Sequence, residues 1–274
     1  MEPYRRSKGA MKDVDSGINI PIDRQYGKIR IGTAGCSIPS RYQEYFTVGE
    51  DHLSRYSAVL NAVEINSTFY RAPRPSTIQR WLDAVPASFR FSLKLSKSIT
   101  HELRFVNAQH QIDEFVKIVE CFSDRAGPIL IQIPPSLEYC DAVVTGLEQL
   151  RDRFSGAVVF EPRNVSWLLP EAETFLRELK IGRVAADPAR APALAHPSGH
   201  GSTVYFRWHG SPVIYRSAYS MEAIQELSTS IQDAASTADQ VWVIFDNTAS
   251  GAATLDALTL LQELEPGINF DRTI

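Results

Sequence analysis

The architecture of this chain follows from the stretch Val63-Glu64-Ile65-Asn66-Ser67-Thr68-Phe69-Tyr70. The stretch begins as an apolar strand and ends as a polar loop. Because alternate side chains of a strand share a face, Glu64 and Asn66 point one way while Val63 and Ile65 point the other. Polar groups at the end of an apolar strand are costly to bury. The pattern therefore indicates a strand whose end belongs to a polar site.

The same arrangement recurs along the chain. Each copy is a short β-prone run that finishes on charged or amide residues, as in Phe91–Lys94, Ile129–Gln132, Val158–Arg163, Val184–Asp187, Val204–His209 and Trp242–Asn247. Short runs that are almost continuously apolar are typical of parallel strands buried on both faces. With a first strand at 29–34, the sequence predicts eight strands.

Helical patterns alternate with these strands. The clearest helix follows residue 108, where one face is formed by apolar residues at i, i+3, i+4, i+7 and i+10, namely Ile112, Phe115, Val116, Val119 and Phe122. Further helices are expected near 50–58, 75–82, 141–153, 220–235 and 250–264, and another is expected to start at Pro170. The segment 188–202 has three prolines, two glycines and no helical stripe, so we expect a lid or binding loop there.

Eight strands, most followed by a helix, predict an α/β fold: a single TIM-type (β/α)8 barrel with an irregular or missing helix after strand six. A doubly wound open sheet is the main alternative, but it needs neither eight units nor polar residues at nearly every strand end. Residues 1–28 are polar, without sustained periodicity, and are expected to form a flexible tail. Residues 29–274 are expected to form the one barrel domain.

Composition narrows the function classes. The chain has 274 residues, of which 44% are hydrophobic and 22% charged, as in ordinary globular proteins. The net charge of −4 argues against a generally basic nucleic-acid binder, although it allows a local basic groove. The three cysteines form no CxxC pair. This pattern gives no support for a zinc site or a disulfide framework, and it fits a reducing compartment. No apolar run reaches the roughly 18 residues of a membrane helix, and no secretory signal is evident, so a cytoplasmic location is expected.

Six motifs in order resemble a known family, the YecE-like proteins (domain-of-unknown-function family seventy-two). The motifs are Glu64-Ile-Asn-Ser-Thr-Phe-Tyr70, Lys94 with Ile99-Thr-His101, Gln132-Ile-Pro-Pro135, Glu161-Pro-Arg163 with Ser166-Trp167, Arg207-Trp-His-Gly210 and Phe245-Asp-Asn247. The resemblance covers nearly the whole chain after the tail. It implies a TIM-type barrel with a polar cleft at the strand ends, and no settled activity.

The chain departs from the family pattern at two positions. The first loop commonly carries a Gly-Trp pair, whereas here Gly35 is followed by Cys36, so the role of the aromatic ring is open. The family often has two asparagines after the last strand, and here the first is Asp246. A reactive thiol at Cys36 is the less favoured interpretation, because no neighbouring charge is known to activate it.

Strand parity directs a mixed set of side chains to the barrel mouth: Glu64, Lys94, Gln132, Glu161, Arg163, Asp187, Arg207, His209 and Asp246. Such a set supplies a general acid and a general base. The expected catalytic residues are Glu64, Glu161, Asp187, His209 and Asp246. The expected ligand-binding residues are Asn66, Tyr70, Lys94, His101, Gln132, Arg163, Trp167, Arg207, Tyr219, Asn247 and Ser250. The alternative is that opposite charges pair off as a structural network.

The function expected from these residues is an enzyme acting on a phosphorylated or other anionic substrate. Glu64 or Glu161 would be the acid/base, and Lys94, Arg163 and Arg207 the anion clamp. Phosphate is expected in the loops after the last two strands, at the small residues that follow Asn247. The alternative is a non-catalytic binding protein for nucleic acid or an anionic metabolite, which for nucleic acid rests on fold analogy with endonuclease IV-type barrels.

Motifs for other chemistries are absent from the sequence, since it contains no GxGxxG, GxxxxGK[ST], HExxH or GxSxG. A divalent metal bound by the mouth carboxylates and histidine is an open alternative. Three neighbouring cations argue against it. No metal ligand set is assigned, and no cofactor or oligomeric state follows from the sequence.

Overall fold

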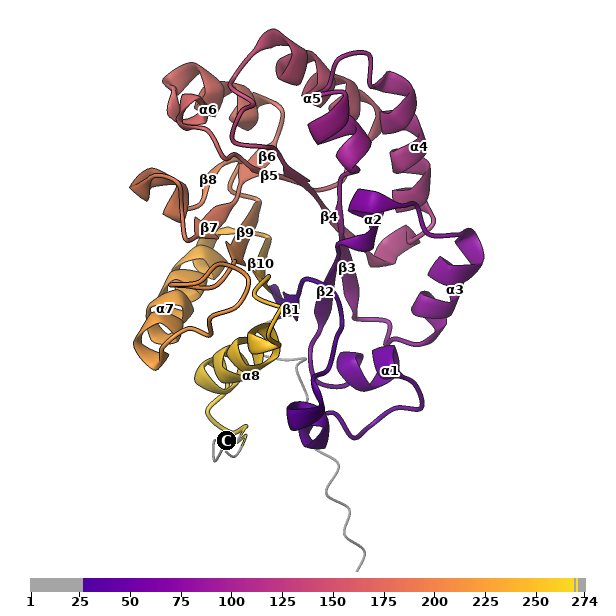
Figure 1. The fold of residues 1–274 in the computed structure, drawn as a ribbon, viewed down its shortest axis with the longest axis vertical. Coiled ribbons are helices and arrows are strands. Elements are labelled where there is room, and N and C mark those ends of the chain that lie inside the picture. The colour runs from indigo at the N-terminus through magenta and orange to yellow at the C-terminus, as the bar shows by residue number, and fades with distance from the viewer. Residues whose placement is uncertain (1–26, 269, 271–274) are drawn as a thin grey trace, which may run out of the picture.

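The computed structural model describes residues 27–268 and Phe270. The predicted tail, residues 1–28, therefore lies outside the described residues except for Gly27 and Lys28. Strands occupy the centre of the molecule and helices surround them (Figure 1). This is the α/β arrangement that the alternation of strand and helix patterns predicted.

The elements follow one another in the expected order. The strands are β1 (Ile29–Thr33), β2 (Ala62–Ile65), β3 (Arg90–Lys94), β4 (Ala126–Gln132), β5 (Val158–Glu161), β6 (Ile181–Arg183), β7 (Ala185–Asp187), β8 (Ser198–Gly199), β9 (Thr203–Trp208) and β10 (Gln240–Phe245). The α-helices are α1 (His52–Ser57), α2 (Ser67–Tyr70), α3 (Pro75–Asp83), α4 (Gln109–Glu120), α5 (Asp141–Arg153), α6 (Pro170–Glu178), α7 (Met221–Thr237) and α8 (Ala252–Leu264). Short 3-10 or π turns are η1 (Ser40–Tyr45), η2 (Ser98–Glu102), η3 (Ser123–Arg125), η4 (Val165–Leu168) and η5 (Pro192–Ala195).

The strands form two sheets, with the orders β1-β10-β9-β7 and β2-β3-β4-β5-β6-β8. All pairings are parallel except that of β8 with β6. On one side the sheets meet through an isolated bridge between Ala34 and Glu64. On the other side the sixth predicted strand is split at Val184, so that β6 pairs with β5 and β7 pairs with β9.

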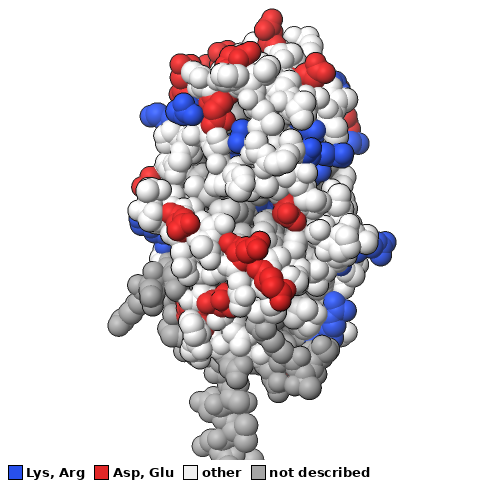
Figure 2. All heavy atoms as spheres, turned by 90° about the vertical axis from the view of Figure 1, so that its left-hand side faces the viewer, with Lys and Arg blue, Asp and Glu red and all other residues white. Residues whose placement is uncertain are grey.

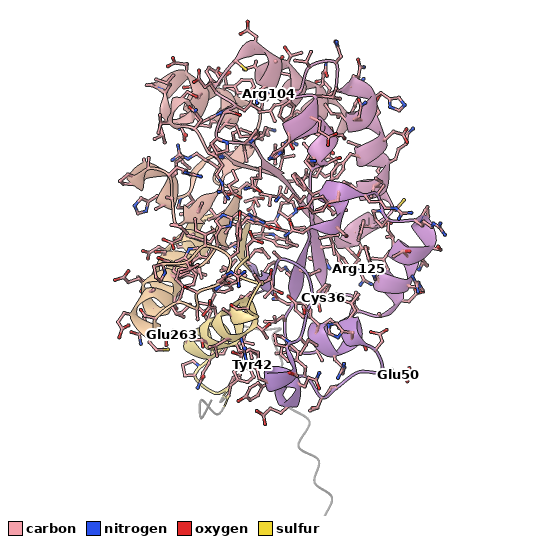
Figure 3. All side chains as sticks on the ribbon, in the orientation of Figure 1. Cys36, Tyr42, Glu50, Arg104, Arg125 and Glu263 are labelled. Atoms are coloured by element: carbon pink, nitrogen blue, oxygen red, sulfur yellow. The ribbon has the colours of Figure 1, made fainter. Side chains whose placement is uncertain are left out.

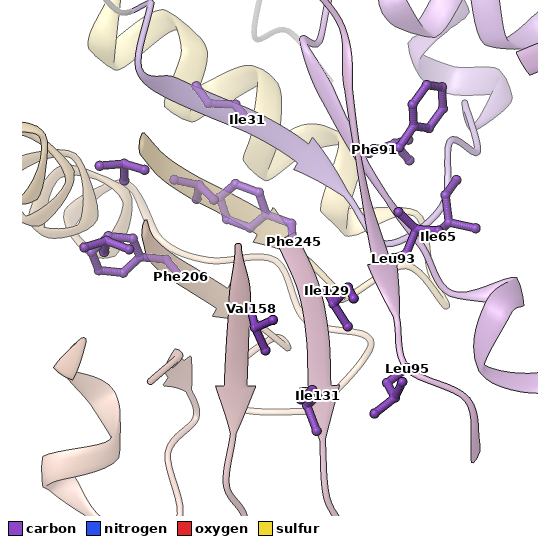
Figure 4. Packing of buried hydrophobic residues seen from close by; sticks show 14 of the residues in the cluster. Ile31, Ile65, Phe91, Leu93, Leu95, Ile129, Ile131, Val158, Phe206 and Phe245 are labelled. Carbon is purple, nitrogen blue, oxygen red and sulfur yellow. The ribbon is translucent and has the colours of Figure 1, made fainter. Parts of the chain in front are cut away.

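Alternation along the strands sorts the core into two layers. The outer layer packs against the helices, and Figure 4 shows part of it, including Ile31, Phe91, Ile129 and Phe245. The inner cluster consists of residues in the strands or directly beside them: Ala34, Ala62, Leu130, Val159, Val184, Tyr205, Trp242 and Ile244. Both faces of each strand are thus buried, which accounts for the almost continuous apolar runs of the sequence.

The contact between the two sheets at β1 and β2 requires glycine. A Cβ atom at Gly32 would lie 2.1 Å from the carbonyl oxygen of Ala62, which belongs to the β2 backbone and cannot move aside. Tyr56 from α1 supports the same junction, because its hydroxyl accepts from Thr33 N and donates to Ala62 O. Close approach of β1 and β2 places their carboxyl ends side by side.

Helix α2 occupies residues that were expected to form a loop, whereas the other helices begin and end close to the predicted residues. In α4 the predicted face is confirmed, since Ile112, Phe115, Val116 and Val119 are buried. Helix α6 starts at Pro170, whose fixed backbone angle suits the first turn. The side chain of Ser220 accepts from the amide of the third helical residue at the start of α7. Within the described residues, no helix is long and apolar enough to cross a membrane.

The segment 188–202 holds η5 and β8 and no α-helix, as predicted for the part after strand six; all of it is described. Several bonds anchor it, however. Glu173 accepts from the Gly199 amide at 2.7 Å, Arg183 donates to the Ala193 carbonyl at 3.0 Å, and the Leu194 side chain is buried. Opening this segment as a lid would break these contacts, so the structure does not favour the predicted lid.

Candidate functional site

Arg207 is the centre of a charged cluster at the carboxyl ends of the strands. Its side chain is fully buried, with 0% exposure. Nε and Nη2 donate to the two oxygens of Glu64 at 2.9 and 2.8 Å, and Nη1 donates to Glu161 Oε2 at 3.1 Å. Nη2 also lies 3.1 Å from Asp246 Oδ2. Nη1 also lies 3.4 Å from His209 Nδ1, so all five N–H groups of this guanidinium face a partner within the cluster.

Polar side chains of β2, β3 and β9 form the layer next to Arg207. The Tyr205 hydroxyl donates to Glu64 Oε2 at 2.8 Å and contacts Ser92 Oγ at 3.1 Å, and Ser92 donates to the Pro128 carbonyl. Burial and the adjacent Glu64 raise the pKa of Tyr205 well above its ordinary value, so the phenol stays protonated. Glu64, also fully buried, orients Arg207 from below.

His209 connects the two remaining carboxylates. Its Nε2 lies 2.9 Å from Glu161 Oε1, and its Nδ1 lies 2.9 Å from Asp246 Oδ2. The imidazole is buried, whereas the Asp246 side chain is 10% exposed. A proton on the ring can therefore be passed to a carboxylate on either side, and the Asp246 end of this path reaches the surface of the mouth.

Both carboxylates stay ionised. Burial alone would raise the pKa of Glu161, but the charges of Arg163, His209 and Arg207 hold it well below the ordinary value of 4.5. Arg163 approaches from above, with Nε 2.8 Å and Nη2 2.7 Å from Glu161 Oε1. Burial opposes the ionisation of Asp246 too, yet Arg207 and His209 lower its pKa.

Lys94 differs from the other cations of the mouth. It is half-buried at the end of β3, and its ammonium lies 4.5 Å from the centre of the Phe69 ring. Within residues 27–268 and Phe270, this ammonium has no ion pair and no hydrogen bond. Burial and the neighbouring charge of Arg207 lower the pKa of Lys94. A cationic group is thus held at the mouth without a direct partner.

The remaining predicted residues lie at the end of β4 or in the segments that follow β2 and β3. Asn66 Nδ2 lies 3.5 Å from Asp246 Oδ1, and Asn66 Oδ1 is buried with no hydrogen-bond partner in the described part of the chain. Gln132 ends β4 and is half-buried. His101 bonds to Thr100 through Nδ1 at 2.8 Å. Tyr70 is 78% exposed.

The predicted inward orientation of Asp187 is wrong. Because Val184 belongs to the inner cluster and Ala185 to the outer one, Asp187 has outward parity. Its carboxylate accepts from the Tyr219 hydroxyl at 2.8 Å and makes no ion pair with a described residue. Tyr219 therefore links the end of β7 to the loop after β9, because its hydroxyl also accepts from the Gly210 amide at 2.9 Å.

Asn247 is likewise on the outer side. It is fully buried, and its Nδ2 donates to Asp256 of α8 at 2.6 Å and to the Ser217 carbonyl at 2.7 Å. Burial raises the pKa of Asp256 to about 7. These bonds fasten the loop before α7 to α8, so Asn247 is placed for structure and not for contact with a ligand in the mouth.

Trp167 lies within the packing between η4 and the strands. It has no exposed surface, its Nε1 donates to the Leu137 carbonyl at 3.3 Å, and its ring centre is 4.4 Å from that of Phe160. Tyr139 contacts its edge at 5.2 Å. The predicted ligand contact of Trp167 is therefore wrong, because no face of the indole is open.

The predicted phosphate site before α8 is also contradicted. The Ser250 hydroxyl donates to the Arg216 carbonyl, and the amides of Ala249, Gly251 and Ala253 donate to carbonyls of Tyr215, Thr248 and Asn247. Arg207, the expected clamp, is buried beneath three carboxylates. Of the amides that were expected to bind phosphate, those of Gly251 and Ala253 already have acceptors.

Three residues of the site were not predicted. Tyr205 and Ser92 share the inward parity of Arg207 and Lys94, so the same alternation could have identified them. Tyr215 has a left-handed backbone with φ of 68°, and its ring centre lies 5.9 Å from that of His209. No strand pattern reaches this loop residue.

Cys36 is labelled in Figure 3 and belongs to the loop after β1. Burial raises the pKa of its thiol, and the charge of Asp51 adds to the effect, so a thiolate is disfavoured. Among the described residues, no group of three His, Cys, Asp or Glu side chains has a geometry that could hold a metal ion. The mouth carboxylates are turned toward guanidinium groups instead.

The family of the chain follows from its sequence as a whole. A family model described as protein of unknown function DUF72 matches residues 30–271. The chain belongs to the DUF72 family. Its relatives include the UPF0759 protein YunF of Bacillus subtilis, which is 21% identical over 80% of this chain and 88% of that protein. The UPF0759 protein YecE of Escherichia coli is 27% identical over 93 residues, and the match spans only 34% of each chain.

Solved structures of DUF72 proteins have the same fold. A member from Enterococcus faecalis superposes with a TM-score of 0.75 at 23% identity, covering 89% of this chain and 97% of that one. A member from Thermotoga maritima gives a TM-score of 0.72 at 26% identity, covering 86% and 99%. The YecE-like resemblance seen in the motifs is thereby confirmed.

Proposed function

We propose that this DUF72 protein is an enzyme that acts on an anionic substrate at the mouth formed by the carboxyl ends of its strands. The observation that carries the proposal is the Lys94 ammonium, which has no direct partner among the described residues although carboxylates lie nearby. Arg207 and Arg163 hold those carboxylates. An incoming anion would supply the partner that Lys94 lacks.

The architecture we propose for this site is a TIM-type barrel. The inner cluster and the outer layer lie on opposite faces of the same strands, as in a closed barrel. The bridge from Ala34 to Glu64 and the split strand β6–β7 connect the two sheets on both sides. In such a barrel the strand ends converge on one mouth, where function is usually located.

Each charged residue has a distinct role in this proposal. Lys94 and Arg163, whose side chain is 12% exposed, attract the anion. Asp246 transfers a proton between the substrate and the ring of His209, and the ionised Glu161 orients that ring. Glu64 and Arg207 lie too deep to touch a substrate and are positioning residues, which revises the acid/base role expected for Glu64 and the clamp role expected for Arg207.

Binding of a nucleic acid is the second candidate, and a specific feature of the rim favours it. Two Tyr-Arg pairs, Tyr70-Arg71 and Tyr215-Arg216, are exposed in the loops after β2 and β9. A base can stack on each tyrosine while the arginine meets a phosphate. Against this candidate, Figure 2 shows acidic and basic side chains interspersed on one face, with no continuous basic surface among its described residues.

Phosphate titration followed by thermal unfolding tests the first candidate. Inorganic phosphate at a hundredfold excess over its Kd should stabilise the protein by about 2.7 kcal/mol. Lys94→Met should abolish the gain. Arg104→Met is the matched control, because Arg104 is a half-buried cation whose guanidinium donates to Ser136. Equal stabilisation of wild type and Lys94→Met would refute the proposal.

Salt dependence separates the two candidates. Binding to a strand with many phosphates should weaken steeply with salt, whereas binding of a small anion should not. For an oligonucleotide, Tyr70→Ala and Tyr215→Ala should each reduce affinity, by about 1–3 kcal/mol per stacked base. Loss of oligonucleotide binding in these variants with phosphate stabilisation unchanged would show that the rim and the mouth are separate sites.

A further inference from the structure

A cavity of about 240 Å³ lies outside the strands, between α8, η1 and the start of α7. Tyr42 and Tyr45 line it from η1, where a spacing of three residues places them on one side of a 3-10 turn. Figure 3 shows Tyr42 beside α8. One face of α8 forms another wall, through residues at helical spacing: Leu255, Leu258, Thr259 and Gln262. None of the charged residues of the mouth lines this cavity, so the two are separate.

Two polar groups of the cavity wall lack the partners that buried groups usually have. Asp256 is 1% exposed and accepts from the Tyr219 amide at 3.2 Å and from Asn247 Nδ2 at 2.6 Å, but it makes no ion pair with a described residue. Buried carboxylates are seldom found without a cation. Tyr42 is 4% exposed, and its hydroxyl has no hydrogen-bond partner in the described part of the chain. A molecule in the cavity would meet both groups.

The charge of the cavity wall is negative. The described residues that line it include no Lys or Arg. The guanidinium of Arg41 lies 4.8 Å from the centre of the Tyr42 ring, but it donates to the Ser250 carbonyl at 2.7 Å and does not line the cavity. Burial raises the pKa of Asp256 to about 7, and no neighbouring cation lowers it. The carboxylate is therefore left without a balancing positive charge.

We propose that this cavity binds a small organic cation, a primary amine that carries an aromatic ring. The ammonium group would donate to the Asp256 carboxylate and to the Tyr42 hydroxyl. The ring would pack among the aromatic side chains of the wall, where Tyr45 and Phe270 are in T-shaped contact, 5.4 Å between centres. This inference does not depend on the proposed function, because the mouth and the cavity share no charged residue.

The volume limits the size of the ligand. A dry cavity of about 150 Å³ in a protein core holds one benzene molecule. By proportion, this larger cavity accepts a ring with a short chain, roughly ten non-hydrogen atoms in all. Leu255 is 37% exposed, which brings the cavity to the molecular surface and gives such a ligand access.

A ligand-detected NMR titration of the full chain tests the inference. Phenethylamine is the cationic probe, phenethyl alcohol is the neutral probe of the same shape, and phenylacetate is the anionic probe. We expect the amine to bind about tenfold or more tightly than the alcohol, as for a hydrogen bond to a charged group, and phenylacetate to bind least. Absence of amine binding, or equal affinity for the amine and the alcohol, would refute the inference.

Variants locate the bound amine. Asp256→Asn should reduce the affinity for the amine to that for the alcohol. Should loss of the Asn247 contact prevent this variant from folding, Tyr42→Phe still tests the site, because it removes a hydroxyl that makes no described bond. We expect Tyr42→Phe to weaken amine binding about threefold.

Tyr139→Phe is the matched control. Tyr139 is half-buried and packs on Trp167, and its hydroxyl has no partner among the described residues. This variant should bind the amine as the wild type does. If Tyr42→Phe also binds the amine with unchanged affinity, the amine is bound elsewhere and the cavity is not its site.

Discussion

Replacing Glu64 by glutamine tests the role assigned to the buried layer. The substitution keeps the shape of the side chain but removes a charge that is fully buried and bound to Arg207 by two hydrogen bonds. Tyr205 would still find one oxygen acceptor. Breaking a buried ion pair by removing one partner costs about 3–5 kcal/mol. Because Glu161 and Asp246 still compensate Arg207, we expect the lower figure, about 3 kcal/mol.

Urea unfolding measures this loss as a lower midpoint with an unchanged slope. The corresponding fall in Tm is roughly 6–12 °C for a chain of this size. Glu138→Gln is the control: Glu138 is exposed, makes no bond within the described residues, and should change stability by less than about 0.5 kcal/mol. A Glu64→Gln protein as stable as this control would show that the buried pair does not stabilise the fold.

Three further predictions concern pH, packing and the outer side of the sheet. Folding lowers the pKa values of Glu161 and Asp246, so these ionised carboxylates stabilise the fold fully above pH 4.5, the ordinary pKa of Glu. This stabilisation is lost as the pH falls below that value, and acid unfolding followed by circular dichroism should show the loss. Gly32→Ala should prevent stable folding because of the Ala62 carbonyl, whereas Gly201→Ala, with open space around it, should not, as thermal melts will show. Tyr219→Phe should cost about 1 kcal/mol in urea unfolding and leave phosphate binding unchanged; loss of binding would place Tyr219 in the site.

Strand alternation was sufficient to predict which side chains gather at the carboxyl ends of the strands. Parity placed Glu64, Lys94, Glu161 and Arg207 on the inner face, because each lies within a regular strand. At Asp187 the prediction was wrong, because alternation counted from Val184, an inner residue, places Asp187 three positions on and therefore on the outer face.

How deeply each side chain is buried is the other property that could not be predicted from the sequence. Glu64 lies near the end of β2 and Asp246 directly follows β10, and both have inward parity. The Glu64 side chain is nevertheless fully buried, whereas the Asp246 side chain is 10% exposed. Trp167 and Ser250 lie near the strand ends in the sequence, but neighbouring loops cover them or use their polar groups. Which residues a ligand can touch depends on the loops, whose paths are set by tertiary contacts.

The most direct test of the account is the position of a heavy anion bound to the crystallised protein. A crystal soaked in a tungstate solution would show that position as an anomalous difference peak. We predict a peak in the mouth, in contact with Lys94 and Arg163, that is absent from Lys94→Met crystals. A peak at the loop 246–251 before α8, or one in the mouth that persists in Lys94→Met, would contradict it.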